Sequence, residues 1–141
     1  MTLVVDASVA LKWFVDEDGS PRAVSVLSSG EPMIARDLVV AEVCNAGWKS
    51  LRRREIDAAQ FDEIAADISQ AFVRLVPLDQ LIRRAAAIAR EPDHPVYDCL
   101  YLALAEAEDV AMVTADRRLV AAVRGTALAD RVSLLGRFGV R

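Results

Sequence analysis

Four carboxylate residues stand where acidic side chains are unusual. Asp6 and Asp116 each follow closely on a short apolar run. Glu42 and Asp98 lie within segments that are otherwise almost wholly apolar, LVVAEVCN and VYDCLYLAL. Both of these segments read as helices that are apolar nearly all round, so we expect Glu42 and Asp98 to be buried. An isolated buried carboxylate is expensive, so each needs a partner: a nearby arginine, a backbone cap or a cation.

Taken together, the four carboxylates predict a site for a hard divalent cation. All four offer oxygen atoms, and neither an imidazole nor a thiolate stands at ligand spacing to them. Mg²⁺, for which Mn²⁺ can substitute, prefers carboxylate and water oxygens. Clustered carboxylates repel one another, so their pKa values rise unless a cation lies between them. With a cation bound, such a cluster supports the attack of water on a phosphodiester.

The elements that must position these residues alternate between short strands and helices. Short apolar or β-branched runs predict five strands, at 2–5, 32–35, 73–78, 110–114 and 132–135. Helical spacing and capping residues predict helices at 9–15, 21–27, 38–54, 57–72, 79–90, 96–107 and 116–123. This alternation predicts a three-layer α/β/α fold with a mainly parallel central sheet. Ligands bind at the carboxyl ends of the strands of such sheets, where Asp6 and Asp116 are expected.

Composition narrows the class of protein. The chain has 141 residues, a net charge of −4, 54% hydrophobic residues, two cysteines and one histidine. We expect one domain over residues 1–141 with a core that needs no disulfide or structural zinc. The acidic balance argues against coating nucleic acid by bulk charge, and the single histidine excludes a mechanism that needs two imidazoles. Without a leader or an apolar run near the roughly 20 residues of a membrane span, we expect a cytoplasmic protein that does not bind membranes.

Other classes of protein that place Asp at strand ends fit less well. A receiver-like signalling domain needs paired acids after its first strand and a late lysine, but the only lysines are Lys12 and Lys49. A metal-dependent phosphatase of the haloacid-dehalogenase type needs Asp-x-Asp there, and this chain has Asp6-Ala7-Ser8. A non-catalytic binding module would tolerate the loss of an acidic position, and none is lost. All three classes remain alternatives to a metal site that hydrolyses phosphodiesters.

Four segments, in this order, resemble the PIN-domain ribonucleases, and within them the VapC toxins of bacterial type II toxin–antitoxin pairs. The segments are VVDAS at 4–8, AEV at 41–43 followed by Asn45, YDCLYLALA at 97–105, and VTADRRL at 113–119. The resemblance covers essentially the whole chain. It implies a parallel sheet flanked by helices, and Mg²⁺ or Mn²⁺ held by Asp6, Glu42, Asp98 and Asp116.

The same resemblance implies an activity and partners. Members of this family cleave single-stranded or loop RNA, often tRNA or ribosomal RNA, and so stop translation. They form homodimers and are silenced by a small antitoxin whose C-terminal segment lies across the active-site groove. We therefore predict a Mg²⁺-dependent endoribonuclease in which Asp6, Asp98 and Asp116 hold metal. Glu42 would complete the cluster or act as base to the attacking water.

Several other residues have two interpretations each. Ser8, Asn45 and Thr114 could orient carboxylates or water, or be ordinary caps and helix polar groups. His94, in the loop sequence PDHP, could lie near the substrate or have no catalytic role. Trp48 could stack on a base, although core packing or a protein interface is commoner for such residues.

One basic cluster follows the segment that carries Glu42. It comprises Lys49, Arg52, Arg53 and Arg54. These cations could contact RNA phosphates, which position a nucleic acid without reading its sequence. They could equally complement the dipole at a helix C-terminus, with Glu55 and Asp57 as their partners.

Overall fold

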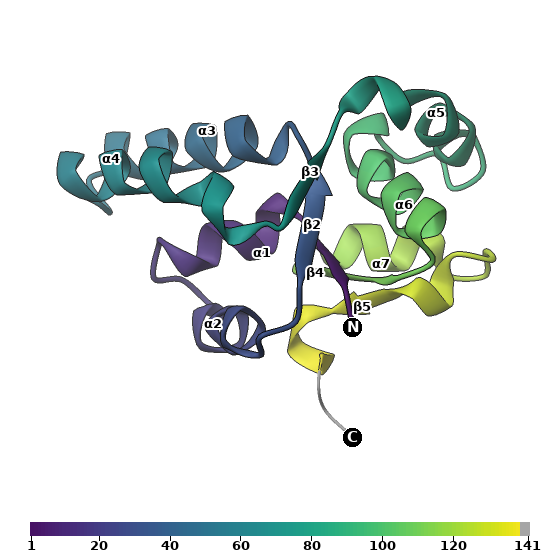
Figure 1. The fold of residues 1–141 in the computed structure, drawn as a ribbon, viewed down its shortest axis with the longest axis horizontal. Helices are drawn as coiled ribbons and strands as arrows, with labels where there is room; N and C mark the ends of the chain where they lie inside the picture. The colour runs from purple at the N-terminus through teal and green to yellow at the C-terminus, as the bar shows by residue number, and fades with distance from the viewer. Residues whose placement is uncertain (139–141) are drawn as a thin grey trace.

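Five parallel strands form the centre of the molecule (Figure 1). The computed structural model describes residues 1–138. The strand order is β3-β2-β1-β4-β5, and every pairing between neighbours is parallel. The strands are β1 (Leu3–Val5), β2 (Met33–Arg36), β3 (Arg74–Val76), β4 (Ala111–Thr114) and β5 (Val132–Leu134). The predicted three-layer α/β/α class is confirmed, and all five predicted strands are present.

Helices cover both faces of this sheet. In Figure 1, α1 to α4 lie on one side of the strands and α5 to α7 on the other. The described α-helices are α1 (Ala7–Ala10), α2 (Ser20–Ser28), α3 (Val39–Arg52), α4 (Ala58–Asp67), α5 (Ile82–Arg90), α6 (Val96–Glu108) and α7 (Arg117–Val123). Because all strands run the same way, their carboxyl ends meet at one edge of the sheet.

The centre of the core is made by β1 and α6. All three residues of β1 are buried, and it lies between β2 and β4. In α6, seven consecutive residues from 99 to 105 are buried, because the helix packs against β1, β2 and β4 on one side and α5 on the other. A helix that is apolar on almost every face is stable only when neighbours cover it in this way.

Three predicted helices are α-helical over only part of their length. The segment 9–15 leaves α-helical geometry after Ala10 and continues as a 3-10 turn, Leu11–Trp13. The segment 57–72 leaves α-helical geometry after Asp67 and continues as a 3-10 turn, Ile68–Ala71. The chain is extended at Phe72, which is 8% exposed and packs on Trp13, so the tight turn lets the chain bury that ring and enter β3. The segment 79–90 likewise begins with a 3-10 turn, and α5 itself starts at Ile82. Within residues 1–138, no helix has the length and apolar character needed to span a bilayer.

We predict that truncating Leu104 to alanine destabilises the protein by about 2–5 kcal/mol, because the substitution leaves a cavity in α6 between the sheet and α5. Leu104 is 1% exposed. The matched control is Leu27→Ala in α2, where the leucine is 41% exposed and the expected loss is below about 1 kcal/mol. Urea unfolding of both variants measures the difference. Equal losses would show that α6 is not the centre of the core.

Candidate active site

Asp6 is a buried carboxylate at the carboxyl end of β1. It caps α1 and is only 4% exposed. Its Oδ1 accepts hydrogen bonds from Ser8 Oγ at 2.6 Å and from the Val9 backbone N–H at 3.2 Å, and its Oδ2 accepts one from Thr114 Oγ1. Burial raises the pKa of Asp6 from 3.8 to about 6, the three hydrogen bonds oppose that rise, and the nearby carboxylate of Asp98 adds to it.

Asp116 lies two residues beyond the end of β4. It caps α7, because its Oδ1 accepts hydrogen bonds from the backbone N–H groups of Arg118 at 2.9 Å and Leu119 at 3.4 Å. Its own backbone N–H donates to Thr114 Oγ1 at 3.0 Å. Thr114 therefore contacts both Asp6 and Asp116, and fixes the end of β1 against the start of α7.

Ser8 makes a second link between the same two segments. Its hydroxyl donates to Asp6 Oδ1 and accepts a hydrogen bond from the Ala115 backbone N–H at 2.9 Å. The structure thus places Ser8 and Thr114 against the carboxylate of Asp6. This is an arrangement in which side chains orient a potential ligand.

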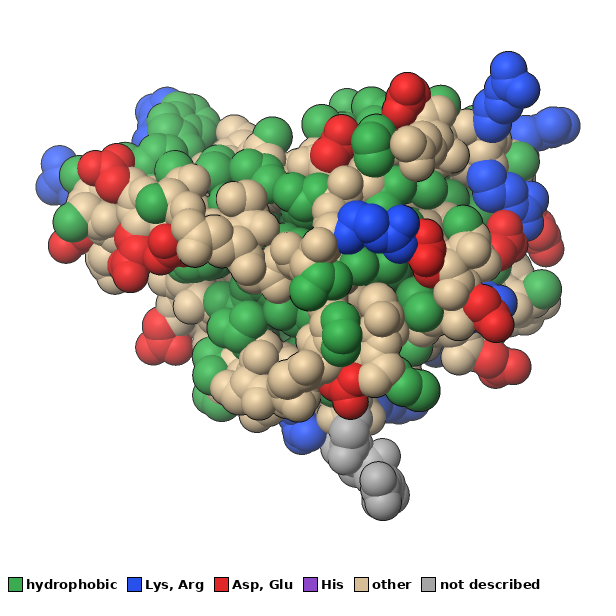
Figure 2. All heavy atoms as spheres, in the orientation of Figure 1, with side chains coloured by type: hydrophobic (Ala, Val, Ile, Leu, Met, Phe, Trp, Pro, Cys, Tyr) green, Lys and Arg blue, Asp and Glu red, His purple; other side chains and the backbone are tan. Residues whose placement is uncertain are grey.

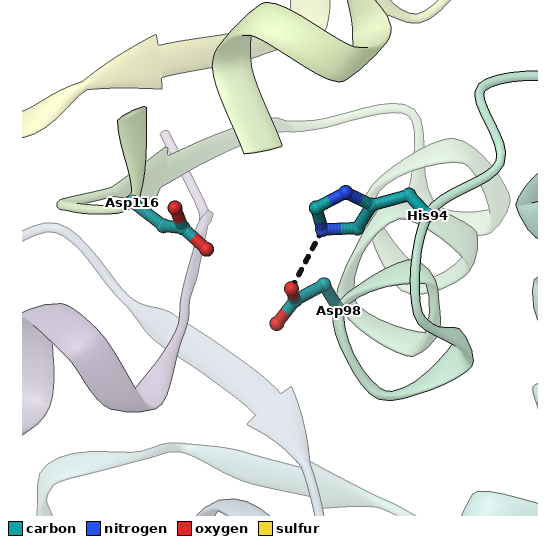
Figure 3. Close-up of side chains that lie close together, drawn as sticks. All are labelled: His94, Asp98 and Asp116. Atoms are coloured by element: carbon teal, nitrogen blue, oxygen red, sulfur yellow. Dashed lines mark hydrogen bonds and ion pairs between the residues drawn. The ribbon is translucent and has the colours of Figure 1, made fainter. Parts of the chain in front are cut away.

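Asp98, in the first turn of α6, faces Asp116 across the opening at this edge (Figure 3). His94, in the loop before α6, places its Nε2 atom 2.7 Å from Asp98 Oδ2. One ligand atom each from His94, Asp98 and Asp116 lie within 4.8 Å of one another, and all three residues are partly buried. The expectation that no imidazole accompanies the carboxylates is therefore wrong. The signal for it was the four-residue spacing from His94 to Asp98 across the start of a helix.

Glu42 and Asp98 are less buried than their apolar surroundings predicted. Each side chain is 31% exposed, because the first turns of α3 and α6 open toward the carboxyl edge of the sheet. Both carboxylates therefore face the opening rather than the core.

Glu42 is held by a buried arginine, a partner that the sequence analysis allowed for it without identifying Arg36. Arg36, the last residue of β2, is fully buried, and its Nη2 lies 2.6 Å from Glu42 Oε1. The guanidinium packs over the rings of Tyr101, at 4.7 Å, and Tyr97, at 5.5 Å. The Tyr101 hydroxyl donates to the same Oε1 at 2.7 Å, and burial raises the pKa of Tyr101, so this hydroxyl stays protonated. A charged residue ending the strand MIAR was the available signal.

The other predicted site residues make no hydrogen bond or ion pair with the four carboxylates within residues 1–138. Asn45 is exposed on α3, and its side chain makes no hydrogen bond within residues 1–138. Arg52, Arg53 and Arg54 are exposed at the C-terminal end of α3.

The donor set at this edge fits a divalent cation. Asp98 and Asp116 present carboxylate oxygens to one shared space, and like charges this close need an offsetting positive charge. His94 Nε2 lies 2.7 Å from an oxygen of Asp98, and a hydrogen bond of this kind restricts the orientation of a carboxylate ligand. Asp6 and Glu42 are not members of this group of three: the carboxylate of Asp6 accepts three hydrogen bonds, and Glu42 is paired with Arg36.

Comparison with known proteins identifies the family of this chain. The PIN domain family matches residues 3–125. Ribonuclease VapC3 of Pyrobaculum aerophilum is 34% identical over 122 residues, covering 84% of this chain and 92% of that protein. Exonuclease VapC9 of the same organism is 31% identical over 97 residues, which are 67% of this chain and 70% of that protein.

A solved structure has the same fold. A chain of a toxin–antitoxin complex from Klebsiella pneumoniae superposes with a TM-score of 0.69 at 17% identity, covering 94% of this chain and 97% of that chain. The resemblance read from the four sequence segments is confirmed. This chain belongs to the PIN domain family.

Proposed function

We propose that this protein is a metal-dependent endoribonuclease, the toxin of a type II toxin–antitoxin pair that cleaves tRNA or ribosomal RNA and inhibits translation. The observation that carries the proposal is the convergence of Asp98 and Asp116, with His94, within 4.8 Å at the carboxyl edge of a PIN-family sheet. The name of the relative VapC3, a ribonuclease, supports the activity. The toxin–antitoxin title of the Klebsiella structure supports the biological role.

In this proposal Mg²⁺, or Mn²⁺ in its place, is held chiefly by Asp98 and Asp116, with Asp6 beside them. When bound, the cation supplies positive charge that holds phosphate oxygens and makes water more acidic. His94 fixes the orientation of Asp98, and Ser8 and Thr114 fix that of Asp6. The protein thereby holds three negative charges in place before RNA arrives.

Glu42 has a different role from the other carboxylates. Its contacts with Arg36 and Tyr101 both use Oε1. No contact to its Oε2 atom is present among the described residues, and the side chain is 31% exposed, so Oε2 would be the atom that accepts a hydrogen bond from water. We assign Glu42 as the group that orients the attacking water and takes its proton, because Arg36 keeps the side chain in one position.

We further propose a homodimer and an antitoxin partner, acting in the cytoplasm. Ile82, Val96 and Tyr97 are 40%, 37% and 66% exposed. With Leu38, Leu78 and Leu100 they line an apolar hollow near the start of α6. Exposed apolar surface of this kind is typical of a protein interface.

We predict that the wild-type protein opens a circular single-stranded RNA in the presence of Mg²⁺ and not in EDTA. Asp116→Asn should reduce this activity by at least about 100-fold, because it removes the charge of a metal ligand. Replacing a residue that only hydrogen-bonds to a metal ligand already costs about 10–100-fold. Gel electrophoresis of the circle measures cleavage, and a circle has no end for an exonuclease to attack.

The matched control is Asp62→Asn, which removes one exposed carboxylate of α4 and should leave the rate unchanged. Activity that survives EDTA would exclude a metal-dependent mechanism. An intact circle together with degraded linear RNA would point to an exonuclease, and no cleavage of either would point to a non-catalytic binding module.

We predict that Asp6→Asn makes the metal-free protein more stable at about pH 7.5. The pKa of Asp6 is about 6 in the folded protein and 3.8 in the unfolded chain. Between these two pH values the folded protein keeps this carboxyl protonated, whereas the unfolded chain does not. The protonated carboxyl therefore makes its full contribution to the free energy of unfolding below about pH 4. This contribution is lost as the pH rises through 6. The loss is on the order of 3 kcal/mol. Urea unfolding from about pH 4 to 8 measures it.

Mg²⁺ separates this effect from simple repacking. Added Mg²⁺ should stabilise the wild type at about pH 7.5, because it favours the charged carboxylates, and should stabilise Asp6→Asn much less. Asp6→Asn should also lose RNA cleavage. A variant less stable than wild type across the whole pH range would contradict the proposed cost of burying this charge.

A further inference from the structure

A polar stripe on α3 leads away from the proposed active site. Glu42, Asn45, Lys49 and Arg52 follow one another at helical spacing and therefore lie on one side of the helix. Asn45, Lys49 and Arg52 are exposed, and Glu42 is partly exposed. From Glu42 to Arg52 the helix rises about 15 Å. The stripe connects the site to the outer end of the arm formed by α3 and α4 in Figure 1.

An exposed tryptophan lies at the outer end of this stripe. Trp48 is 43% exposed, and the Arg52 guanidinium carbon lies 5.1 Å from the centre of its ring. Trp48, Lys49, Arg52 and Arg53 line one shallow hollow of the surface. Trp13, by contrast, is partly buried and donates its indole N–H to the Ala23 carbonyl. Trp48 is therefore not part of the core.

The cations around Trp48 are not neutralised by neighbouring acids. Within residues 1–138, none of Lys49, Arg52 and Arg53 forms an ion pair. The carboxylate of Asp57 instead accepts the Gln60 backbone N–H in the capping box of α4. The ion pairs between these cations and Asp57 that the sequence allowed are therefore not formed within residues 1–138. Figure 2 shows blue side chains beside a green group at this end of the molecule.

We propose that Trp48 with Lys49, Arg52 and Arg53 forms a platform for single-stranded RNA, on which a base stacks against the indole while the cations contact flanking phosphates. This inference rests on the proposed ribonuclease function, because the bound strand would follow α3 toward Glu42. In a chain of net charge −4, a local cluster of cations is what a polyanion needs. An acidic peptide would need the charges alone, whereas an exposed flat ring next to arginine is typical of single-stranded nucleic-acid sites.

The fluorescence of Trp48 tests the stacking directly. The chain has two tryptophans, so in Trp48→Phe only Trp13 reports. Wild type in EDTA is titrated with an unstructured RNA, with an abasic oligonucleotide of the same length, and with poly-glutamate. We expect RNA to quench the emission of the wild type and not that of Trp48→Phe. The abasic strand and poly-glutamate should leave the emission unchanged, because neither offers a base.

Charge variants test the phosphate contacts. Arg52→Ala/Arg53→Ala should weaken RNA binding at least about 10-fold and lower the slope of log Kd against log salt by about 2. The matched control is Arg83→Ala/Arg90→Ala, which removes two exposed arginines of α5 that have no ion pair among the described residues. The control should change neither the affinity nor the salt slope.

Three results would overturn the platform. RNA that binds without quenching Trp48 would exclude stacking, and equal quenching by poly-glutamate would identify an acidic protein surface as the ligand. Unchanged RNA affinity in Trp48→Ala, in a protein that cleaves RNA, would refute the platform and leave the nuclease proposal intact. Quenching that depends on Trp48 in a protein without cleavage would support the platform and refute the nuclease proposal.

Discussion

The burial of the Asp6 carboxylate is the constraint on which the rest of this edge depends. The Asp6 carboxylate is only 4% exposed, and it is tolerated because two hydroxyls hydrogen-bond to it. One belongs to Ser8, two residues along the chain, and the other to Thr114 at the end of β4. Those same hydroxyls bind the backbone of Ala115 and Asp116. The network that satisfies one buried acid therefore also fixes the position of a second. It brings like charges together where a cation, or a proton, relieves their repulsion.

The carboxylates differ in how their charge is balanced. Glu42 is paired with the buried guanidinium of Arg36, which packs over two tyrosine rings. Asp98 has the imidazole of His94, and Asp116 has only backbone N–H groups at the start of α7. The side of the site near Asp98 and Asp116 thus requires charge from outside the chain, whereas the side near Glu42 does not. This asymmetry separates the proposed cation-holding residues from the proposed base.

The sequence predicted the features that follow from local pattern. Short apolar strands alternating with helices predict a parallel sheet, and parallel strands place Asp6 and Asp116 at one edge whatever the loops do. The exposure of Glu42 and Asp98 was not predictable from their apolar neighbours, because it depends on where the first turns of α3 and α6 meet the sheet edge. The sequence allowed an arginine partner for Glu42 but did not single out Arg36, because the rings that bury it, Tyr97 and Tyr101, lie about sixty residues away and meet it only in the fold.

The most direct measurement is a crystal structure of the wild type grown with millimolar Mn²⁺, with anomalous data collected at the manganese edge. The metal site described above predicts a strong anomalous peak between the carboxylates of Asp98 and Asp116, absent from crystals of Asp116→Asn. A map without a peak at this edge of the sheet, or with manganese bound only elsewhere on the molecule, would contradict the claim that these carboxylates form a cation site.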